Sequence, residues 1–219
     1  MRETLRYPFD REHRFDAVLV GGGLHLLAVW VPLVPFLAVA GYLLRVLSRT
    51  AEAGRIRGVA APSWRPVGPL LADGVRAVGV TVAYLAVPVA LFVVTLGGPL
   101  EVLDPTGTTD GLLFLVGSTV VLFLGLALGY PLPAALAAVA SERRFRAGFD
   151  RRLVGAACRD GRYLFAVVTA AVGIALGAAA YDPLNTVAVG FFVAFYVEVV
   201  CAALVGRAAG TVWTRRDLR

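Results

Sequence analysis

Charged side chains in this chain are confined to a few islands, and long apolar segments separate the islands. The 219-residue sequence is 58% hydrophobic and 16% charged, whereas soluble domains carry about 25% charged residues. All 21 basic residues are arginine, and they fall at 2–14, 45–76, 143–162 and 207–219. A transmembrane helix needs about 20 apolar residues to cross about 30 Å of hydrocarbon. The pattern therefore predicts an integral membrane protein that crosses the bilayer several times.

The apolar segments predict about five transmembrane helices in an all-α, polytopic helical membrane bundle. They cover 17–47, 75–96, 111–129, 163–180 and 186–205. The first segment is longer than one crossing requires, and Pro32 and Pro35 should kink or break it. Asp73, which precedes Gly74, is expected to cap the N-terminus of the second helix. We expect one integral membrane domain over residues 1–219.

Two halves of the chain repeat one order of features. Each has a long apolar segment, a pair of prolines, a short apolar helix, an Arg/Gly-rich loop, an Asp-Gly pair and a further span. Half one covers residues 17–98 and half two residues 111–206. The order predicts an internal duplication. The halves should be parallel, because both Arg-rich loops, 48–74 and 141–162, are expected on the same side of the membrane.

The arginines also predict the orientation in the cell membrane. Loops rich in basic residues face the cytoplasm. Loops 48–74 and 141–162 and the C-terminus are therefore predicted inside, and the Arg-free connections 97–110 and 181–186 outside. The side of the N-terminus depends on segment 17–47: a single crossing places the N-terminus outside, and a re-entrant turn at the prolines places it inside. We favour one kinked crossing, which gives five spans.

Short motifs along the chain resemble a known family. They are Tyr7-Pro8-Phe9, Gly41-Tyr42-Leu43-x-Arg45, Pro62-x-Trp64, Asp73-Gly74, Pro133-Ala134-Ala135, Phe149-Asp150 and Tyr163. In this order and spacing the chain resembles the archaeal multi-pass membrane family of domain of unknown function 4013, over most of its length. The family has no assigned activity. The resemblance therefore implies a multi-pass membrane protein and no particular mechanism.

Two ionisable residues, His25 and Glu198, fall within predicted spans. A carboxylate at mid-bilayer costs roughly 2.5–3.5 kcal/mol on insertion scales, so Glu198 should be neutral, paired or facing a polar interior. One interpretation is a proton or cation site in the bundle, with His25 as its partner. The other is a structural hydrogen bond to a neighbouring helix. We favour the structural interpretation for both residues.

The second Arg-rich loop offers candidate contacts to lipid or to a protein partner. These contacts are Arg143, Arg144, Arg146, Arg151 and Arg152. A basic residue beside the membrane contributes about 1 kcal/mol toward anionic lipid. Orienting the protein in the bilayer is the alternative role of these arginines.

Three small-residue spacings predict close helix contacts. They are Gly125-x-x-x-Gly129, Gly173-x-x-x-Gly177 and Gly206-x-x-x-Gly210. Small residues at such spacing let helix backbones approach closely. We expect these contacts within one chain rather than between two.

Signatures of several functional classes are missing from the sequence. There is no HExxH, GxSxG or Walker motif, the two histidines lack metal-ligand spacing, and the two cysteines form no CxxC. The basic segments lack the features of nucleic-acid-binding modules. We therefore expect no catalytic residues, no metal, no cofactor and no nucleic-acid partner.

Two functional hypotheses follow from these observations. The leading one is a non-enzymatic integral membrane protein that binds membrane lipids, or a protein partner, through its cytoplasmic Arg-rich loops. A homo-oligomer or a membrane protein partner is compatible with it. The alternative is a small transporter or channel subunit with an intramembrane site at Glu198.

Overall fold

The computed structural model describes residues 4–5, 7, 16–97, 108–185 and 188–218. Within these ranges the regular structure is helical and contains no strand, which confirms the all-α fold class. Five described segments are long and apolar enough to cross a membrane: Leu33–Ala53, Val67–Thr95, Phe114–Glu142, Gly161–Tyr181 and Val189–Arg215. The chain is thus a multi-pass helical membrane protein. The predicted outer connections 97–110 and 181–186 lie partly outside the described residues.

The elements follow the chain in a simple order. They are α2 (Asp16–Ala28), α3 (Leu33–Ala53), α4 (Val67–Phe92), η2 (Val93–Gly97), α5 (Thr108–Gly129), α6 (Leu132–Glu142), η3 (Phe145–Phe149), α7 (Arg151–Cys158), α8 (Gly161–Asn185) and α9 (Val189–Arg215).

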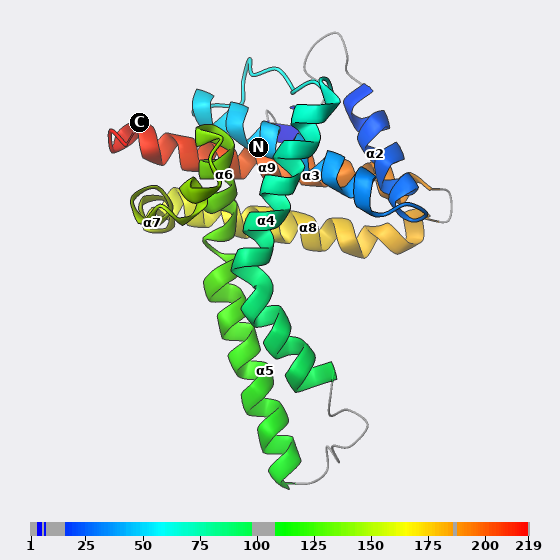
Figure 1. The fold of residues 1–219 in the computed structure, drawn as a ribbon, viewed down its shortest axis with the longest axis vertical. Helices are drawn as coiled ribbons and strands as arrows, with labels where there is room; N and C mark the ends of the chain where they lie inside the picture. The colour runs from blue at the N-terminus through cyan, green and yellow to red at the C-terminus, as the bar shows by residue number, and fades with distance from the viewer. Residues whose placement is uncertain (1–3, 6, 8–15, 98–107, 186–187, 219) are drawn as a thin grey trace.

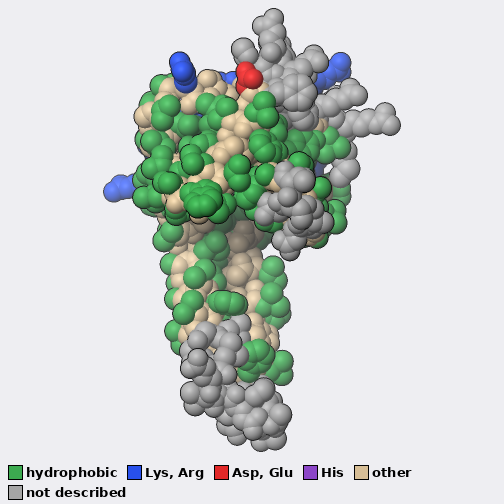
Figure 2. Space-filling model, turned by 90° about the vertical axis from the view of Figure 1, so that its right-hand side faces the viewer, with side chains coloured by type: hydrophobic (Ala, Val, Ile, Leu, Met, Phe, Trp, Pro, Cys, Tyr) green, Lys and Arg blue, Asp and Glu red, His purple; other side chains and the backbone are tan. Residues whose placement is uncertain are grey.

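One helical hairpin projects from the body of the molecule, and a second lies across that body (Figure 1). α4 and α5 form a stem that projects from the body, and α8 packs along α9 across the top of this stem (Figure 1). The C-terminal ends of α3, α6 and α9 lie away from the tip of the stem. Figure 2 shows one face, on which apolar side chains cover the stem and the visible charged side chains lie on the body. In Figure 1 the α8–α9 hairpin runs crosswise to the α4–α5 stem.

The first apolar segment is two helices rather than one. α2 ends at Ala28 and α3 begins at Leu33, so the chain breaks at Pro32, as predicted. Pro32 has no N–H and its ring clashes with the preceding turn. Pro35 lies in the first turn of α3, where a missing donor is tolerated.

This break corrects the predicted first span, 17–47. α2 has 13 residues, which gives a length of about 20 Å, less than the hydrocarbon thickness of about 30 Å. α3 alone is long enough to cross. α2 packs beside it, against α3 and α9. The side of the N-terminus stays a prediction.

A second break separates α5 from α6, and a tyrosine from α8 fills it. The hydroxyl group of Tyr163 donates to the carbonyl oxygen of Tyr130 at 3.0 Å and accepts from the N–H of Ala134 at 2.9 Å. In a continuous helix these two backbone groups, four residues apart, would bond to each other. The fully buried Tyr163 side chain is therefore inserted into the helical hydrogen-bond ladder, a recognised cause of kinks.

Two of the three predicted glycine spacings make close contacts, and both contacts are within the chain. Gly206-x-x-x-Gly210 of α9 faces the backbone of Leu47 and Ala51 on α3. Gly173-x-x-x-Gly177 of α8 faces side chains of α9. Around Gly125-x-x-x-Gly129, nothing described lies within 4 Å of where a Cβ atom would stand. That spacing makes no close approach.

The first Arg-rich connection is shorter than predicted. Helix α3 continues to Ala53 and α4 begins at Val67, so the connection is 54–66 rather than 48–74. Asp73 is therefore not a helix cap, because it lies inside α4. Its carboxylate binds arginines instead. The helix begins earlier than the Asp73-Gly74 pair predicted, at Val67.

The second connection, 141–162, contains η3 and α7 rather than only loop. Asp150 caps α7 by accepting from the N–H of Arg152 at 2.8 Å. Asp160 accepts from the N–H of Arg162 at 2.8 Å, at the start of α8. The two Asp-Gly pairs thus have different roles. The internal duplication stays a prediction.

Candidate functional site

Helices α2 and α9 bring His25 and Glu198 together. Nε2 of His25 lies 3.2 Å from Oε1 of Glu198, and Nδ1 of His25 lies 3.0 Å from the carbonyl oxygen of Gly21. The side chains are 22% and 35% exposed, respectively. The contact considered from the sequence is therefore present. Its use as an ion site stays a prediction.

The hydrogen bond to Gly21 determines how protons are arranged in this pair. A carbonyl oxygen only accepts, so Nδ1 of His25 carries a hydrogen. Nε2 then either donates as part of an imidazolium or accepts from a protonated carboxyl group of Glu198. In both states one proton lies between the two side chains and the pair has no net charge. A neutral pair suits an apolar environment, because an uncompensated buried charge is strongly unfavourable.

Glycines allow α2 to lie close enough for the contact. A Cβ atom at Gly21 would collide with the ring of Phe195, and one at Gly22 would collide with Phe192. The Phe195 ring also packs edge-on to His25, with centroids 5.8 Å apart. The glycines in the middle of α2 and the aromatic face of α9 therefore position the imidazole.

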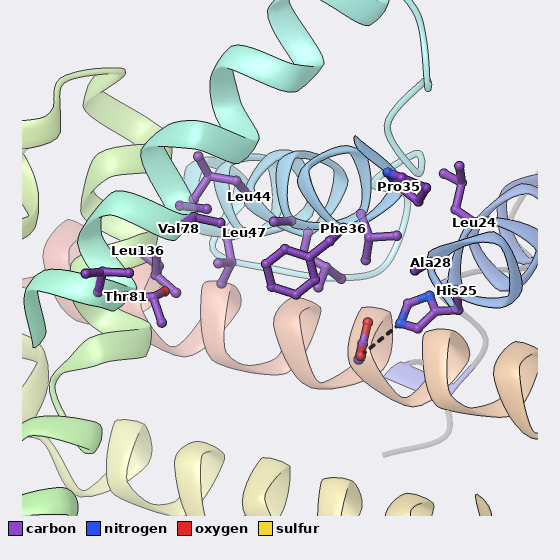
Figure 3. Close-up of a pocket in the computed structure, with 16 residues that line it drawn as sticks. Leu24, His25, Ala28, Pro35, Phe36, Leu44, Leu47, Val78, Thr81 and Leu136 are labelled. Atoms are coloured by element: carbon purple, nitrogen blue, oxygen red, sulfur yellow. Dashed lines mark hydrogen bonds and ion pairs between the residues drawn. The ribbon is translucent and has the colours of Figure 1, made fainter. Parts of the chain in front are cut away.

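An apolar cleft of about 390 Å³ extends from this pair (Figure 3). His25 and Leu24 lie at one end, and Thr81 and Leu136 lie at the other. Residues from α2, α3, α4, α6 and α9 line it, almost all of them apolar. A smaller cleft of about 270 Å³, between α8 and α9, also includes Glu198 in its lining. Glu198 therefore borders two clefts.

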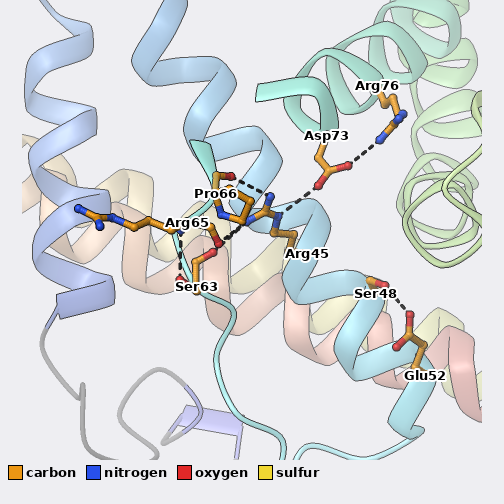
Figure 4. A network of polar contacts seen from close by, with 8 residues as sticks. All are labelled: Arg45, Ser48, Glu52, Ser63, Arg65, Pro66, Asp73 and Arg76. Carbon is orange, nitrogen blue, oxygen red and sulfur yellow. Dashed lines mark hydrogen bonds and ion pairs between the residues drawn. The ribbon is translucent and has the colours of Figure 1, made fainter. Parts of the chain in front are cut away.

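A second polar site surrounds Arg45, at the junction of α3, α4 and the 54–66 connection (Figure 4). Nε of Arg45 donates to Oδ2 of Asp73 at 3.2 Å, and its Nη atoms donate to the carbonyl oxygens of Ser63 at 2.9 Å and Pro66 at 3.4 Å. Arg76 donates to Oδ1 of Asp73 at 2.7 Å. Arg45, which belongs to α3, therefore ties both the 54–66 connection and α4 to that helix.

The five arginines proposed from the sequence do not form one cluster. Arg143 has a left-handed backbone, with φ of 53°, and ends α6. It borders a cleft of about 780 Å³ whose arginines are Arg45, Arg49, Arg65, Arg76 and Arg143. Another cleft, of about 830 Å³, includes Arg144, Arg146 and Arg152 in its lining. Arg151 is exposed in the first turn of α7 and is not part of either lining.

The sequence hypothesis included both Arg-rich loops but named individual contacts only in the second, so it did not name the arginines of the first segment that line the cleft of about 780 Å³. The sequence shows Arg45 shortly after Gly41-Tyr42, and Asp73 before Gly74, but only the structure pairs the two side chains. Asp73 was instead expected to cap the N-terminus of the second helix.

Within the described part of the chain, no group of three His, Cys, Asp or Glu side chains is placed to hold a metal ion. Cys158 and Cys201 are free thiols.

The chain matches the model of a family described as a protein of unknown function, DUF4013, over residues 24–206. That range includes His25, Glu198 and the arginines that line the clefts of about 780 Å³ and about 830 Å³. No curated protein and no solved structure matches the chain.

Proposed function

The chain belongs to the DUF4013 family of unknown function, and from that premise we propose a non-enzymatic membrane protein that binds anionic lipid headgroups. The proposed binding site is the cleft bordered by Arg143, which we call the basic cleft. One observation carries the proposal: five arginines and only two acidic residues, Glu52 and Asp73, line this cleft.

The charges in the basic cleft are not balanced internally. Asp73 is shared by Arg45 and Arg76, and Glu52 accepts from the hydroxyl group of Ser48 at 2.7 Å. Among the residues that the structure describes, the guanidinium groups of Arg65 and Arg143 have no carboxylate partner. They are therefore available to an anion.

The position of the basic cleft suits a lipid headgroup. It lies at the C-terminal ends of α3 and α6 and at the N-terminal part of α4, next to apolar segments long enough to cross the membrane. Headgroups occupy this depth in a bilayer. Arginine binds phosphate through paired N–H donors, which gives geometric selectivity as well as charge.

The test is retention of anionic phospholipid by the purified protein, measured by native mass spectrometry. We expect Arg65→Gln with Arg143→Gln to weaken binding roughly 30-fold, since two juxtamembrane arginines contribute about 2 kcal/mol. The matched control is Arg151→Gln with Arg162→Gln, which removes the same charge outside the basic cleft. The control should change binding little. Unchanged binding in the first variant, or an equal loss in both, would contradict a specific site.

A second candidate function is a small transporter or channel subunit. One observation favours it: Glu198 borders clefts on two sides, and its partner His25 is on a helix that ends at a proline break. Broken helices often mark transport sites. A pH- or ion-dependent flux in reconstituted vesicles, abolished by Glu198→Gln, would support transport. If the parent protein shows no such flux, this candidate is wrong.

A further inference from the structure

We propose that the apolar cleft next to His25 and Glu198 binds a neutral single-chain lipid alcohol, with its hydroxyl group at Glu198. This site is separate from the basic cleft and takes a different class of ligand. The inference rests on the shape and lining of the cleft, on an unused acceptor of Glu198, and on the charge state of the His25–Glu198 pair.

The apolar lining of this cleft favours a hydrocarbon chain as its occupant. Between its polar end at His25 and its far end at Leu136, the cleft is bordered by side chains such as Phe36, Leu44 and Val78 (Figure 3). Its volume of about 390 Å³ lies in the usual range for small-molecule sites. Water needs two to four polar partners to occupy a cavity stably, and an apolar wall does not provide them.

Glu198 provides a polar anchor at the end of the cleft. Its Oε1 atom is occupied by His25. Its Oε2 atom is buried and has no hydrogen-bond partner among the described residues. A buried acceptor left without a donor is unfavourable. A ligand hydroxyl group that reaches Oε2 would satisfy this acceptor while Oε1 keeps its contact with His25.

The His25–Glu198 pair has no net charge, which favours a ligand whose hydrogen-bond donor is also neutral. Because His25 and Glu198 share one proton, together they carry no net charge, and an ammonium headgroup would add an uncompensated charge. A carboxylate or phosphate headgroup would place a second anion beside Glu198. A hydroxyl group donates one hydrogen bond without adding charge.

The edge of the cleft is open to the surroundings of the helices. Phe36 of α3 and Val82 of α4 border it, and each is 58% exposed. Both belong to segments long enough to cross the membrane. A lipid chain therefore enters the cleft sideways from the bilayer, without crossing a charged surface.

The test uses hexadecanol carrying a photoreactive diazirine in the middle of its chain. The full-length protein is reconstituted in phosphatidylcholine vesicles, illuminated, and the labelled peptides are located by mass spectrometry. We expect labels on the cleft-facing parts of α3 and α4. Unlabelled hexadecanol should compete, and hexadecane and hexadecylamine should compete at least tenfold less well.

Two variants test the two ends of the cleft independently. Glu198→Leu removes the acceptor, and Val78→Trp fills the cleft away from Glu198; each should reduce labelling at least tenfold. The matched control Val89→Trp changes an exposed position on the same helix and should leave labelling unchanged. If Glu198→Leu does not fold, Val78→Trp still decides whether the cleft is the site.

Three outcomes would overturn the proposal: labels spread evenly over all apolar helices, equal competition by hexadecane, or labelling unchanged in both cleft variants. Preferred competition by hexadecylamine would show that the site takes a cation. Arg65→Gln with Arg143→Gln should not alter labelling, so failure of the basic cleft and failure of this site are distinguishable.

Discussion

Gly41 of α3 and Gly74 of α4 face one another where the two helices cross, and neither position has room for a Cβ atom. At Gly41 the added atom would collide with the carbonyl oxygen of Leu70, and at Gly74 with that of Leu37. Arg45 lies one turn after Gly41 on the same face, and Asp73 precedes Gly74. The close crossing therefore places the Arg45–Asp73 ion pair, and with it one wall of the basic cleft.

We expect Gly74→Ala to destabilise the protein by about 1–3 kcal/mol or more, because the added methyl group forces two backbones apart. Thermal unfolding in detergent measures the effect. Gly68→Ala is the matched control on the same helix, since nothing lies within 4 Å of a Cβ atom there. The control should be neutral or stabilising by up to about 1 kcal/mol, because alanine favours helix. Equal effects at both positions would contradict the close crossing.

Arg45→Gln should release the 54–66 connection, because the guanidinium group holds its backbone as well as Asp73. We expect a cost of about 1.5–3 kcal/mol from the lost hydrogen bonds of a charged group, and faster proteolysis within 54–66. Limited proteolysis followed by mass spectrometry measures this.

The control for Arg45 is Arg144→Gln. Arg144 pairs with Glu142 at 3.1 Å, but its side chain is 77% exposed. Exposed pairs contribute between zero and about 1 kcal/mol, so this variant should resemble the parent protein. If Arg45→Gln leaves proteolysis of the connection unchanged, the structural role assigned to Arg45 is wrong.

Tyr163→Phe should destabilise the α5–α6 break by about 1–3 kcal/mol, because a buried donor and a buried acceptor of the backbone both lose their partner. Chemical denaturation of the reconstituted protein measures the change. Tyr42→Phe is the control. Tyr42 is fully buried too, but its hydroxyl group has no partner among the described residues. Removing that hydroxyl group should be neutral or stabilising, and the opposite ranking of the two variants would contradict the inserted-hydroxyl geometry.

Features set by local chemistry were predictable from the sequence. The break at Pro32 follows from the missing N–H of proline. The contact of His25 with Glu198 was expected as one of two interpretations, because a lone carboxylate in a span requires a partner.

Features set by helix crossings were not predictable from the sequence. Asp73-Gly74 resembles a helix start, but α4 begins earlier, at Val67, and Gly74 allows the close crossing with α3. The five loop arginines separate because Arg143 adopts a left-handed backbone and turns the chain. The apolar cleft depends on side chains from five helices, and no local pattern encodes how those helices meet.

Glu198→Gln should leave the protein folded and inserted, at a cost of about 1–2 kcal/mol. A glutamine amide can donate to Nε2 of neutral His25, so the contact is largely retained. Yield and thermal unfolding in detergent measure this. A failure of the variant to insert would show that the structure depends on the shared proton rather than on the hydrogen bond.

Cysteine labelling tests how the chain is threaded through the membrane. Burial raises the pKa of the Cys158 thiol, which lowers its reactive thiolate fraction at neutral pH. Before labelling, both native cysteines are replaced by alanine. One new cysteine is then introduced in each variant, as Thr106→Cys, Arg146→Cys or Arg216→Cys. A membrane-impermeant maleimide should label Thr106→Cys in intact cells and the other two only after permeabilisation. The reason is that Arg-rich segments face the cytoplasm, and both α6 and α9 end in such segments. Labelling of Arg146→Cys from outside intact cells would contradict this topology.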